Sequence, residues 1–568
     1  MKPILSKLLV YLAVSLVILF SSCTPTTRTI NETYSENILI NQLGYKPNAE
    51  KKALIRADVD VFELVDKTGK VVFEAPAGEF KYWELSGDSV RLADFTSFNT
   101  SGEYHICING TELSSPFVIN DNPFKGLADA VLKSYYYARC GVDITEKFGG
   151  KWNWKAGHPD KNVLIHASAA DKNRPEGTSI SSPGGWYDAG DFGKYIVNSG
   201  ISTYTLLLSA TLNSEFHKLQ NINIPESGNN LPDILNESLV NLKWMITMQD
   251  PNDGGLYHKL TTKNFVGFVL PSETNEQRYV VQKSTSAALD FAATMAYASR
   301  IFEKYNMPDL AAEMKISAEK AWQWALKNPD VIYNQPKDIS TGGYGDNRLV
   351  DEWFWAAAEM YLLSGEESYK EVMLSNYEKP VTPKWNVVNT LGIISLLTSD
   401  KRGEFEDFEK DFIEYADNML AIEKESPYLV STNKFAWGSN SDVANDGMLK
   451  LIAYHLSGNE KYIVSAQNDL DYILGRNATG YSFVTGFGSK PPMHIHNRIS
   501  SADAVEEPVP GYLAGGPNTV VLNDCAAQNV ERSLFPAKSY TDTECSYSTN
   551  ETAINWNAPL VFLTAGLN

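Results

Sequence analysis

Two carboxylates, Asp188 and Asp191, stand three positions apart in the glycine-rich stretch GGWYDAGDFGKY of residues 184–195. Like charges placed so close together repel, so such a pair needs a cation, a shared proton or a catalytic task. Acids in a turn supply oxygen ligands for calcium, and an acid pair can also hold and activate a water molecule. The pair alone does not decide between these alternatives.

Two further loop clusters carry side chains that complete a candidate catalytic site. The first, PPMHIHNR, holds two histidines and an arginine, and the second, DTECSYSTNE, holds acids and a tyrosine: His494, His496 and Arg498, then Asp542, Tyr547 and Glu551. Each cluster alone has a structural explanation, such as a buried histidine or an acid at a helix N-terminus. Together they supply what acetal hydrolysis requires, which is one carboxylate that takes a proton from water and one carboxyl group that donates a proton to the leaving oxygen.

The composition narrows the class of partner. With 568 residues, of which 43% are apolar and 21% charged, the chain is typical of a globular protein with more than one domain. A net charge of −20 excludes nucleic acid as a partner, because phosphate binding needs a basic face. A neutral ligand such as a glycan is compatible with this charge.

The N-terminus has the pattern of an exported lipoprotein. Residues 1–22 combine two lysines with one apolar run, which is typical of a signal peptide. Small residues then precede Cys23, as in a bacterial lipoprotein box whose cysteine is lipidated. We predict that residues 23–36 form a lipidated tether to a membrane of the cell envelope, with the outer membrane as the expected one and its side left open. A signal peptide followed by an unrelated cysteine is the alternative.

Two kinds of hydrophobic spacing divide the rest of the chain. Residues 37–121 alternate with period two between turn residues, which predicts a small β-sandwich. Residues 122–568 carry apolar residues at helical spacing in roughly a dozen segments, which predicts paired helices that close into a toroid. The long segments 250–282 and 475–550 are rich in Gly, Pro, His and aromatic residues, and loops of this length are usually functional.

Several segments resemble the signature sequences of glycoside hydrolase family 9. They are GGWYDAGDFGKY, SFVTGFG with PPMHIHNR, and DTECSYSTNETAINWNAPLVF. The stretch INQLGYKPNAEKKALI of residues 40–55 is similar to the start of the immunoglobulin-like domain that precedes the catalytic domain in one branch of this family. The resemblance implies an immunoglobulin-like β-sandwich at 37–121, an (α/α)6 barrel at 122–568 and an inverting, cellulase-type activity.

The resemblance also implies roles for individual residues. Asp191 matches the general base that activates water, Asp188 matches the acid that helps to hold this water, and Glu551 matches the general acid. The other matches are a supporting acid, two groups that bind the sugar and two aromatic residues that line the cleft: Asp542, His496, Arg498, Tyr547 and Trp355. Asn497 replaces the second histidine of the family's His-His-Arg element.

The implied chemistry requires no cofactor, but the family raises the question of metals. Some members of this branch bind zinc through two Cys and two His. Here one candidate ligand remains and other residues occupy the remaining positions, so zinc is not expected: Cys140 is kept, whereas Lys161, Asn162 and Tyr187 are the replacements. Calcium is common in the family, and the stretch QDPNDGG offers oxygen ligands from Asp250, Asn252 and Asp253. We leave open whether this stretch binds calcium or is a plain turn, and whether Cys525 and Cys545 form a disulfide.

The predicted function is hydrolysis of internal β-1,4-glucosidic bonds, with inversion, in a soluble plant β-glucan such as a cellulose-type glucan, mixed-linkage glucan or xyloglucan. An exo-acting β-glucosidase or glucosaminidase on the same fold is one alternative, and a non-catalytic glycan-binding lipoprotein is another. We expect the β-sandwich to support the barrel, because its segment shows no aromatic cluster beyond Tyr82 and Trp83.

Overall fold

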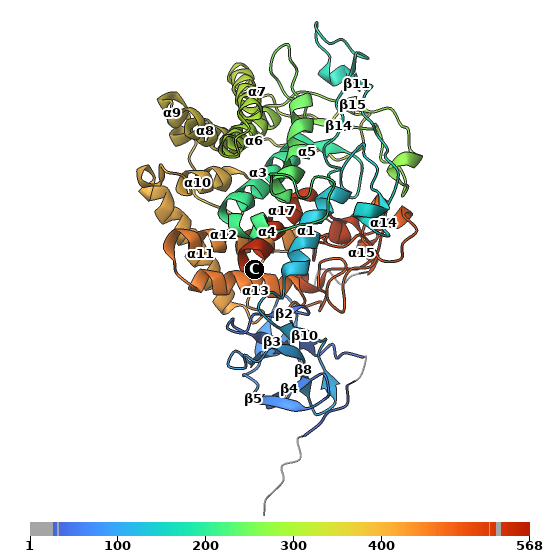
Figure 1. The fold of residues 1–568 in the computed structure, drawn as a ribbon, viewed down its shortest axis with the longest axis vertical. Coiled ribbons are helices and arrows are strands. Elements are labelled where there is room, and N and C mark those ends of the chain that lie inside the picture. The colour runs from blue at the N-terminus through green and yellow to red at the C-terminus, as the bar shows by residue number, and fades with distance from the viewer. Residues whose placement is uncertain (1–25, 31–32, 522, 530–534) are drawn as a thin grey trace, which may run out of the picture.

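The computed structural model describes residues 26–30, 33–521, 523–529 and 535–568. The predicted signal peptide and Cys23 lie outside the described residues. A small β-domain occupies one end of the molecule and a large helical domain the other (Figure 1). No helix in the described part of the chain is long and apolar enough to cross a membrane.

The β-domain is the predicted sandwich of two sheets. The four-stranded sheet has the order β1 (Ile38–Leu39), β3 (Lys52–Ile55), β7 (Asp88–Asp94), β6 (Lys81–Trp83). The second sheet has the order β2 (Gly44–Tyr45), β10 (Phe117–Ile119), β8 (Gly102–Ile108), β4 (Val61–Asp66), β5 (Val71–Pro76), and β9 (Glu112–Leu113) also pairs with β8. Alternate residues such as Phe62 and Leu64 on β4 and Ile106 on β8 point into one shared core, as period-two spacing requires.

The helical domain consists of an inner and an outer ring of helices. The inner helices are buried over most of their length: α3 (Ile196–Leu212), α6 (Thr285–Lys304), α8 (Val350–Ser364), α10 (Asn389–Leu397), α12 (Ser439–Ser457) and α17 (Ile554–Leu567). Each packs against an amphipathic outer helix: α5 (Asp233–Thr247), α7 (Pro308–Lys327), α9 (Glu367–Ser375), α11 (Glu406–Glu425), α13 (Lys461–Ile473) and α1 (Lys125–Tyr137). The pairing confirms the predicted (α/α)6 barrel. The shorter helices are α2 (Glu146–Gly149), α4 (Ser214–Leu219), α14 (Arg498–Ala502), α15 (Ala526–Asn529) and α16 (Tyr547–Asn550).

A small sheet that the sequence analysis did not predict joins the loops at the barrel. Its order is β12 (Ser179–Ile180), β11 (Val163–Ile165), β15 (Tyr279–Val280), β14 (Lys259–Thr261), β13 (Lys194–Tyr195). Each strand has only two or three residues, too few to show an alternating pattern. The sheet matters for function because β13 follows directly on the stretch that contains Asp188 and Asp191.

The two domains are held together by a buried aromatic contact and by polar bonds. Trp83 turns inward, and its ring centre lies 4.7 Å from that of Tyr428 in the helical domain. Asn41 donates a buried hydrogen bond of 2.8 Å to Asp471. Tyr82, by contrast, is 60% exposed. These contacts support the expectation that the sandwich stabilises the barrel.

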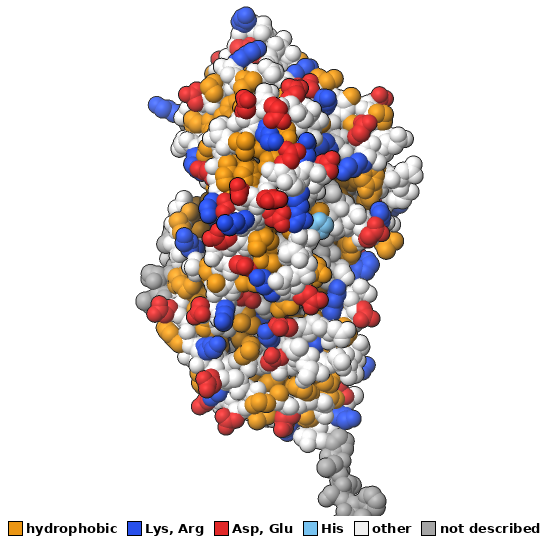
Figure 2. Space-filling model, turned by 90° about the vertical axis from the view of Figure 1, so that its left-hand side faces the viewer, with side chains coloured by type: hydrophobic (Ala, Val, Ile, Leu, Met, Phe, Trp, Pro, Cys, Tyr) orange, Lys and Arg blue, Asp and Glu red, His pale blue; other side chains and the backbone are white. Residues whose placement is uncertain are grey.

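Charged side chains of both signs are interspersed on the face of the molecule shown in Figure 2. Basic residues form no continuous area on this face, in keeping with the net charge of −20. Nucleic acid binding would need such an area.

Candidate active site

A cleft of about 330 Å³ brings together residues from loops that are far apart in the sequence. Its lining includes the predicted acids Asp191 and Glu551. It also includes six aromatic residues: Tyr195, Phe265, Tyr344, Trp385, Trp437 and Trp556. Two acids that are 360 residues apart in the sequence therefore face the same open space.

Asp188 is buried behind this cleft and held by two donors. Its carboxylate accepts hydrogen bonds from the Tyr344 hydroxyl at 2.7 Å and from the Asn198 amide at 2.8 Å. Burial, followed by the charge of Asp191, raises the pKa of Asp188 to about 7, and the two donors oppose that rise. The backbone carbonyl of Asp188 accepts from the N–H of Ile554 at 2.8 Å, so the turn is tied to the start of α17.

Asp191 lies in the cleft wall and is 8% exposed. Its Oδ2 accepts hydrogen bonds from the Gly193 N–H at 3.0 Å and from the Tyr195 hydroxyl at 3.2 Å. Glycine is needed at position 190, because a Cβ there would stand 2.3 Å from the carbonyl oxygen of His496. The glycine-rich pattern around the two acids thus lets the turn pack directly against the histidine loop.

Glu551 stands between α16 and α17 and reaches the cleft from the opposite direction. Its backbone carbonyl accepts from the Gly515 N–H at 2.9 Å, and its segment forms a short bridge with His496. Burial raises its pKa well above the usual value, and the charges of Asp191 and Asp188 raise it further, whereas Arg498 acts in the opposite sense. Glu551 therefore stays protonated at pH values where an ordinary glutamate is ionised.

His496 and Arg498 brace the same region. His496 Nδ1 lies 2.6 Å from the carbonyl oxygen of Glu544, so Nδ1 carries a proton and donates it to that oxygen. Arg498 donates from Nη1 to the Gly190 carbonyl at 2.6 Å and from Nε to the Val266 carbonyl at 3.0 Å. The arginine thereby ties the turn that carries Asp188 and Asp191 to the loop that follows β14. The structure shows this bracing contact, and the sugar-binding role implied for Arg498 stays a prediction.

Comparisons with known proteins agree with this geometry. Residues 124–564 match glycosyl hydrolase family 9, and residues 33–112 match the cellulase N-terminal ig-like domain. The chain belongs to glycosyl hydrolase family 9. A xyloglucan-specific endo-β-1,4-glucanase of Bacteroides ovatus is 42% identical over 573 residues, which cover 96% of each protein. Endoglucanase D of Acetivibrio thermocellus is 30% identical over 584 residues, which cover 100% of this chain and 86% of the relative.

A solved structure described as Bacteroides ovatus GH9 has the same fold. It superimposes with a TM-score of 0.87 at 43% sequence identity, and the match covers 94% of this chain and 98% of that chain. The protein described here is thus a family 9 glycoside hydrolase, as its signature segments predicted.

The predicted aromatic residues of this family 9 cleft need one correction. Trp355 does not line the cleft: it is 0% exposed on the inner helix α8, and its ring packs edge-on against Tyr204 at 5.3 Å. A ring so enclosed by the barrel core cannot stack on a sugar. Tyr547 lies beside the site, with its ring centre 5.7 Å from His496 and 5.6 Å from Trp437.

The sequence analysis missed Trp385 and Trp437 as cleft residues. Both stand in loops that lead into inner helices, Trp385 before α10 and Trp437 before α12. An aromatic residue in a polar loop is more often free to face a ligand than one at helical spacing, and this signal distinguishes them from Trp355.

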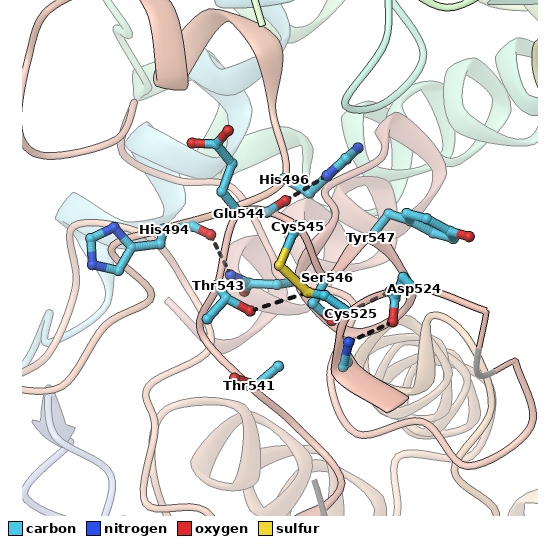
Figure 3. Close-up of a disulfide and its surroundings, with 12 residues drawn as sticks. His494, His496, Asp524, Cys525, Thr541, Thr543, Glu544, Cys545, Ser546 and Tyr547 are labelled. Atoms are coloured by element: carbon cyan, nitrogen blue, oxygen red, sulfur yellow. Dashed lines mark hydrogen bonds between the residues drawn. A yellow bond between two sulfur atoms is a disulfide. The ribbon is translucent and has the colours of Figure 1, made fainter. Parts of the chain in front are cut away.

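Asp542 and His494 lie outside the cleft lining. The Asp542 carboxylate accepts from the backbone N–H groups of Met493 and His494 at 2.8 and 2.9 Å, and from the Asn550 amide at 2.9 Å. Asp542 therefore holds the histidine loop through backbone hydrogen bonds, and the supporting role in catalysis implied for it stays a prediction. His494 is exposed and points away from His496 (Figure 3).

The surroundings of Cys140 are unfavourable for zinc. The thiol lies 3.3 Å from the carbonyl oxygen of His158 and 3.6 Å from Asp160 Oδ2. Two buried cations, Lys194 and Arg278, form ion pairs with Asp160 at 2.7 and 3.1 Å. These cations already neutralise the acid and repel a divalent ion, so the residues here do not fit a zinc site.

A lysine lies among the acids of the stretch for which calcium binding was left open. Asp250 and Asp253 lie close to Asp171, in the arrangement of a cation site. However, Lys283 Nζ stands 2.7 Å from Asp250, 2.9 Å from Asp253 and 3.5 Å from Asp171. Asn252 uses its side-chain amide to donate to Asp250 at 2.8 Å. The ammonium group occupies the position a calcium ion would need, so calcium does not fit this stretch.

A further group of buried acids lies beside the inner helices α6 and α8. Four buried carboxyl groups beside α6 and α8 have side-chain oxygens without hydrogen-bond partners among the described residues: Asp290, Asp346, Asp351 and Glu352. Burial raises the pKa of each of them. A raised pKa favours the protonated carboxyl form, which is a poor ligand for a cation.

A disulfide lies in the long segment that precedes Glu551. Cys525 and Cys545, which the sequence analysis left open, are bonded to each other across a sequence separation of 20 (Figure 3). Next to one cysteine, the Asp524 carboxylate accepts from the Ser548 N–H at 2.6 Å in α16. Next to the other, the Glu544 carbonyl accepts from His496. The disulfide thus supports both the histidine and the helix that leads to Glu551.

We expect removal of this disulfide to lower activity in addition to stability. In the double variant C525S/C545S, loss of the loop constraint should cost about 3 kcal/mol of unfolding free energy. The residues next to the two cysteines hydrogen-bond to His496 and to α16, and without the disulfide these residues are held less firmly. We therefore expect kcat/KM also to fall, by about threefold to tenfold at a temperature where the variant is fully folded. C107A, which changes a buried free cysteine of the β-domain, is the control and should keep its kcat/KM. A lowered melting temperature with unchanged kcat/KM in the double variant would show that the disulfide only stabilises.

Proposed function

We propose that this family 9 enzyme is an inverting endo-β-1,4-glucanase in which Asp191 is the general base and Glu551 the general acid. The observation that supports this most strongly is that both groups line one cleft, where burial and the charges of Asp191 and Asp188 raise the pKa of Glu551. Asp191 accepts two hydrogen bonds at one oxygen, as a carboxylate does. One cleft therefore offers a proton acceptor and a proton donor.

In the proposed reaction, a water molecule binds between Asp191 and the anomeric carbon, and Asp188 helps to orient it. Asp191 takes a proton from this water as the oxygen attacks. Glu551 gives its proton to the glycosidic oxygen, which leaves with the departing sugar chain. A single displacement of this kind inverts the anomeric carbon and requires the two carboxyl groups to be about 6.5–9.5 Å apart.

The roles are tested by the variants D191N and E551Q and by the anomer of the product. Each variant should lose at least about a hundredfold in kcat, because each lacks one of the two proton transfers. Proton NMR during hydrolysis by the wild type should show the α-anomer first, before mutarotation. A β-anomer formed first would contradict inversion. Near-normal turnover in either variant would remove that residue from its role.

We further propose xyloglucan as the preferred substrate among soluble plant β-glucans. The Bacteroides ovatus relative is named a xyloglucan-specific endo-β-1,4-glucanase. In the cleft, flat aromatic rings offer stacking surfaces for a glucan backbone. Gly342, Gly343 and Gly438 also line it, and the lack of side chains there leaves room beside the backbone for branches.

A hydrolysis panel of xyloglucan, mixed-linkage glucan and carboxymethyl-cellulose tests this preference. We expect xyloglucan to be cleaved at least about tenfold faster than the others, because a branch adds contacts worth more than about 1 kcal/mol. Viscosity should fall well before reducing ends accumulate, as internal cleavage requires. Release of single sugars from chain ends with unchanged viscosity would instead support the exo-acting alternative.

A lipid tether at Cys23 is the proposed attachment to the cell envelope. The charged N-terminal region, the apolar run and the small residues before Cys23 support it. The first described residues lie on the β-domain, where the Val71 N–H donates to the Thr26 carbonyl at 2.9 Å beside β5. A tether that enters there would place the β-domain between the membrane and the barrel (Figure 1).

A further inference from the structure

Two adjacent buried residues, His258 and Lys259, bind four successive carbonyl groups of one cleft wall. Lys259 Nζ donates to the carbonyl oxygens of Thr341 at 3.4 Å and Gly342 at 2.6 Å. His258 Nε2 lies 3.2 Å from the carbonyl oxygen of Gly343 and 3.1 Å from that of Tyr344. Segment 341–344 is therefore held along its whole length by two side chains.

The hydrogen bonds determine the protonation of His258. Because Nε2 faces two carbonyl acceptors, it carries the proton, and Nδ1 accepts from the Ser284 hydroxyl at 2.8 Å. Burial, and then the charge of Lys259, lower the pKa of His258 to about 3. The imidazole is thus neutral over the pH range in which a glycosidase works, and it acts as a fixed donor.

Segment 341–344 ends with Tyr344, whose side chain contacts Asp188. Tyr344 has a φ of 50°, a left-handed conformation that is uncommon for a bulky residue and needs support from its surroundings. Its hydroxyl donates to Asp188 at 2.7 Å, and its ring lies in the cleft lining. The carbonyl contacts of His258 and Lys259 supply the support that this strained conformation requires.

A second path leads from Lys259 to Asp191. Lys259 and Tyr195 are opposite each other in the β13–β14 pair, and Nζ lies 5.5 Å from the centre of the Tyr195 ring. The Tyr195 hydroxyl donates to Asp191 at 3.2 Å. Lys259 is 0% exposed and forms no ion pair within the described residues.

Among the described groups that face Lys259, Asp191 is the negatively charged one. Its polar contacts are the carbonyls above, the Thr341 hydroxyl and the Gln335 side chain, which are neutral. The titratable groups that face it are the neutral His258, the phenols of Tyr195 and Tyr333, and Asp191. Burial lowers the pKa of Lys259 to about 7, and Asp191 opposes this by favouring the ammonium form.

We propose that His258 and Lys259 are positioning residues for the reaction: they fix Tyr344 against Asp188 and Tyr195 against Asp191, and the Lys259 ammonium group places a buried positive charge behind the Tyr195 ring. This inference rests on the proposed function, since it assumes that the two acids activate water. Neither residue touches the substrate in this arrangement. Their effect reaches the reaction through the two tyrosines.

The variants K259M and K259R test the role of the lysine. K259M should lower kcat at least tenfold and change KM less than threefold, since a small displacement of catalytic groups has a large effect on rate. It should also move the acidic limb of the pH profile of kcat/KM to higher pH, because a buried positive charge near the catalytic acids is lost. This limb is measured below pH 7, where Lys259 is charged. K259R keeps the charge, so it should return the limb toward the wild-type position.

H258N removes the other two carbonyl contacts and leaves the charge of Lys259 in place. It should lower kcat severalfold without moving the acidic limb. It therefore tests the hydrogen bonds to segment 341–344 separately from the charge, and it remains informative if K259M does not fold. The matched control is K450M, which removes an equally buried lysine whose partners are Asp469 and Glu423 in the barrel. K450M should lower the melting temperature and leave the pH profile of the folded enzyme unchanged.

The proposal is overturned if folded K259M keeps kcat within twofold and an unmoved acidic limb, or if H258N keeps the wild-type kcat. The proposal is also overturned if K450M shifts the acidic limb as far as K259M does, because a general loss of packing would then explain the shift. These results are distinguishable from failure of the proposed function. In that case D191N or E551Q would retain activity, whatever the result with the lysine variants.

Discussion

Crowding of three carboxyl groups in and behind one cleft is the constraint on which the structure of the active site depends. Asp188, Asp191 and Glu551 cannot all be ionised at such proximity without a large electrostatic cost. The three groups have different surroundings. Burial and the charges of the two aspartates keep the proton on Glu551, whereas hydroxyl, amide and backbone groups donate hydrogen bonds to the aspartates. The difference between a proton donor and a proton acceptor thus comes from their surroundings, since all three groups are carboxyl groups.

The fold holds these acids together against their repulsion because it brings rigid segments from distant parts of the chain to one place. The aspartate turn precedes α3, the histidine loop precedes α14, and Glu551 precedes α17, the last inner helix. Arg498, the disulfide and Asp542 then tie these loops to one another. Because the inner helices are buried over most of their length, the loops are anchored to a core that cannot easily relax the repulsion.

Much of this could be predicted from the sequence, because the acids lie in loops with distinctive glycine and aromatic neighbours. Asp191 and Glu551 belong to such loops, and the structure brings them to the same cleft. Trp355 was placed in the cleft because it matches an aromatic position of the family, but it lies on the inner helix α8, where its ring is fully buried. Lys259 and Lys283 could not be interpreted at all, since a lysine is read as exposed until a structure shows its partners. The short sheet that carries Lys259 had too few residues per strand to be seen.

Infrared difference spectroscopy of the carboxyl groups tests the central claim most directly. The spectrum of the wild type minus that of E551Q, recorded across a range of pH, isolates the protonated carboxyl band of Glu551. If the neighbouring acids hold this proton, the band should persist at neutral pH, and the pH at which it disappears should be lower when Asp191 is replaced by Asn. A Glu551 that is already ionised at neutral pH, or whose titration does not respond to D191N, would contradict the account.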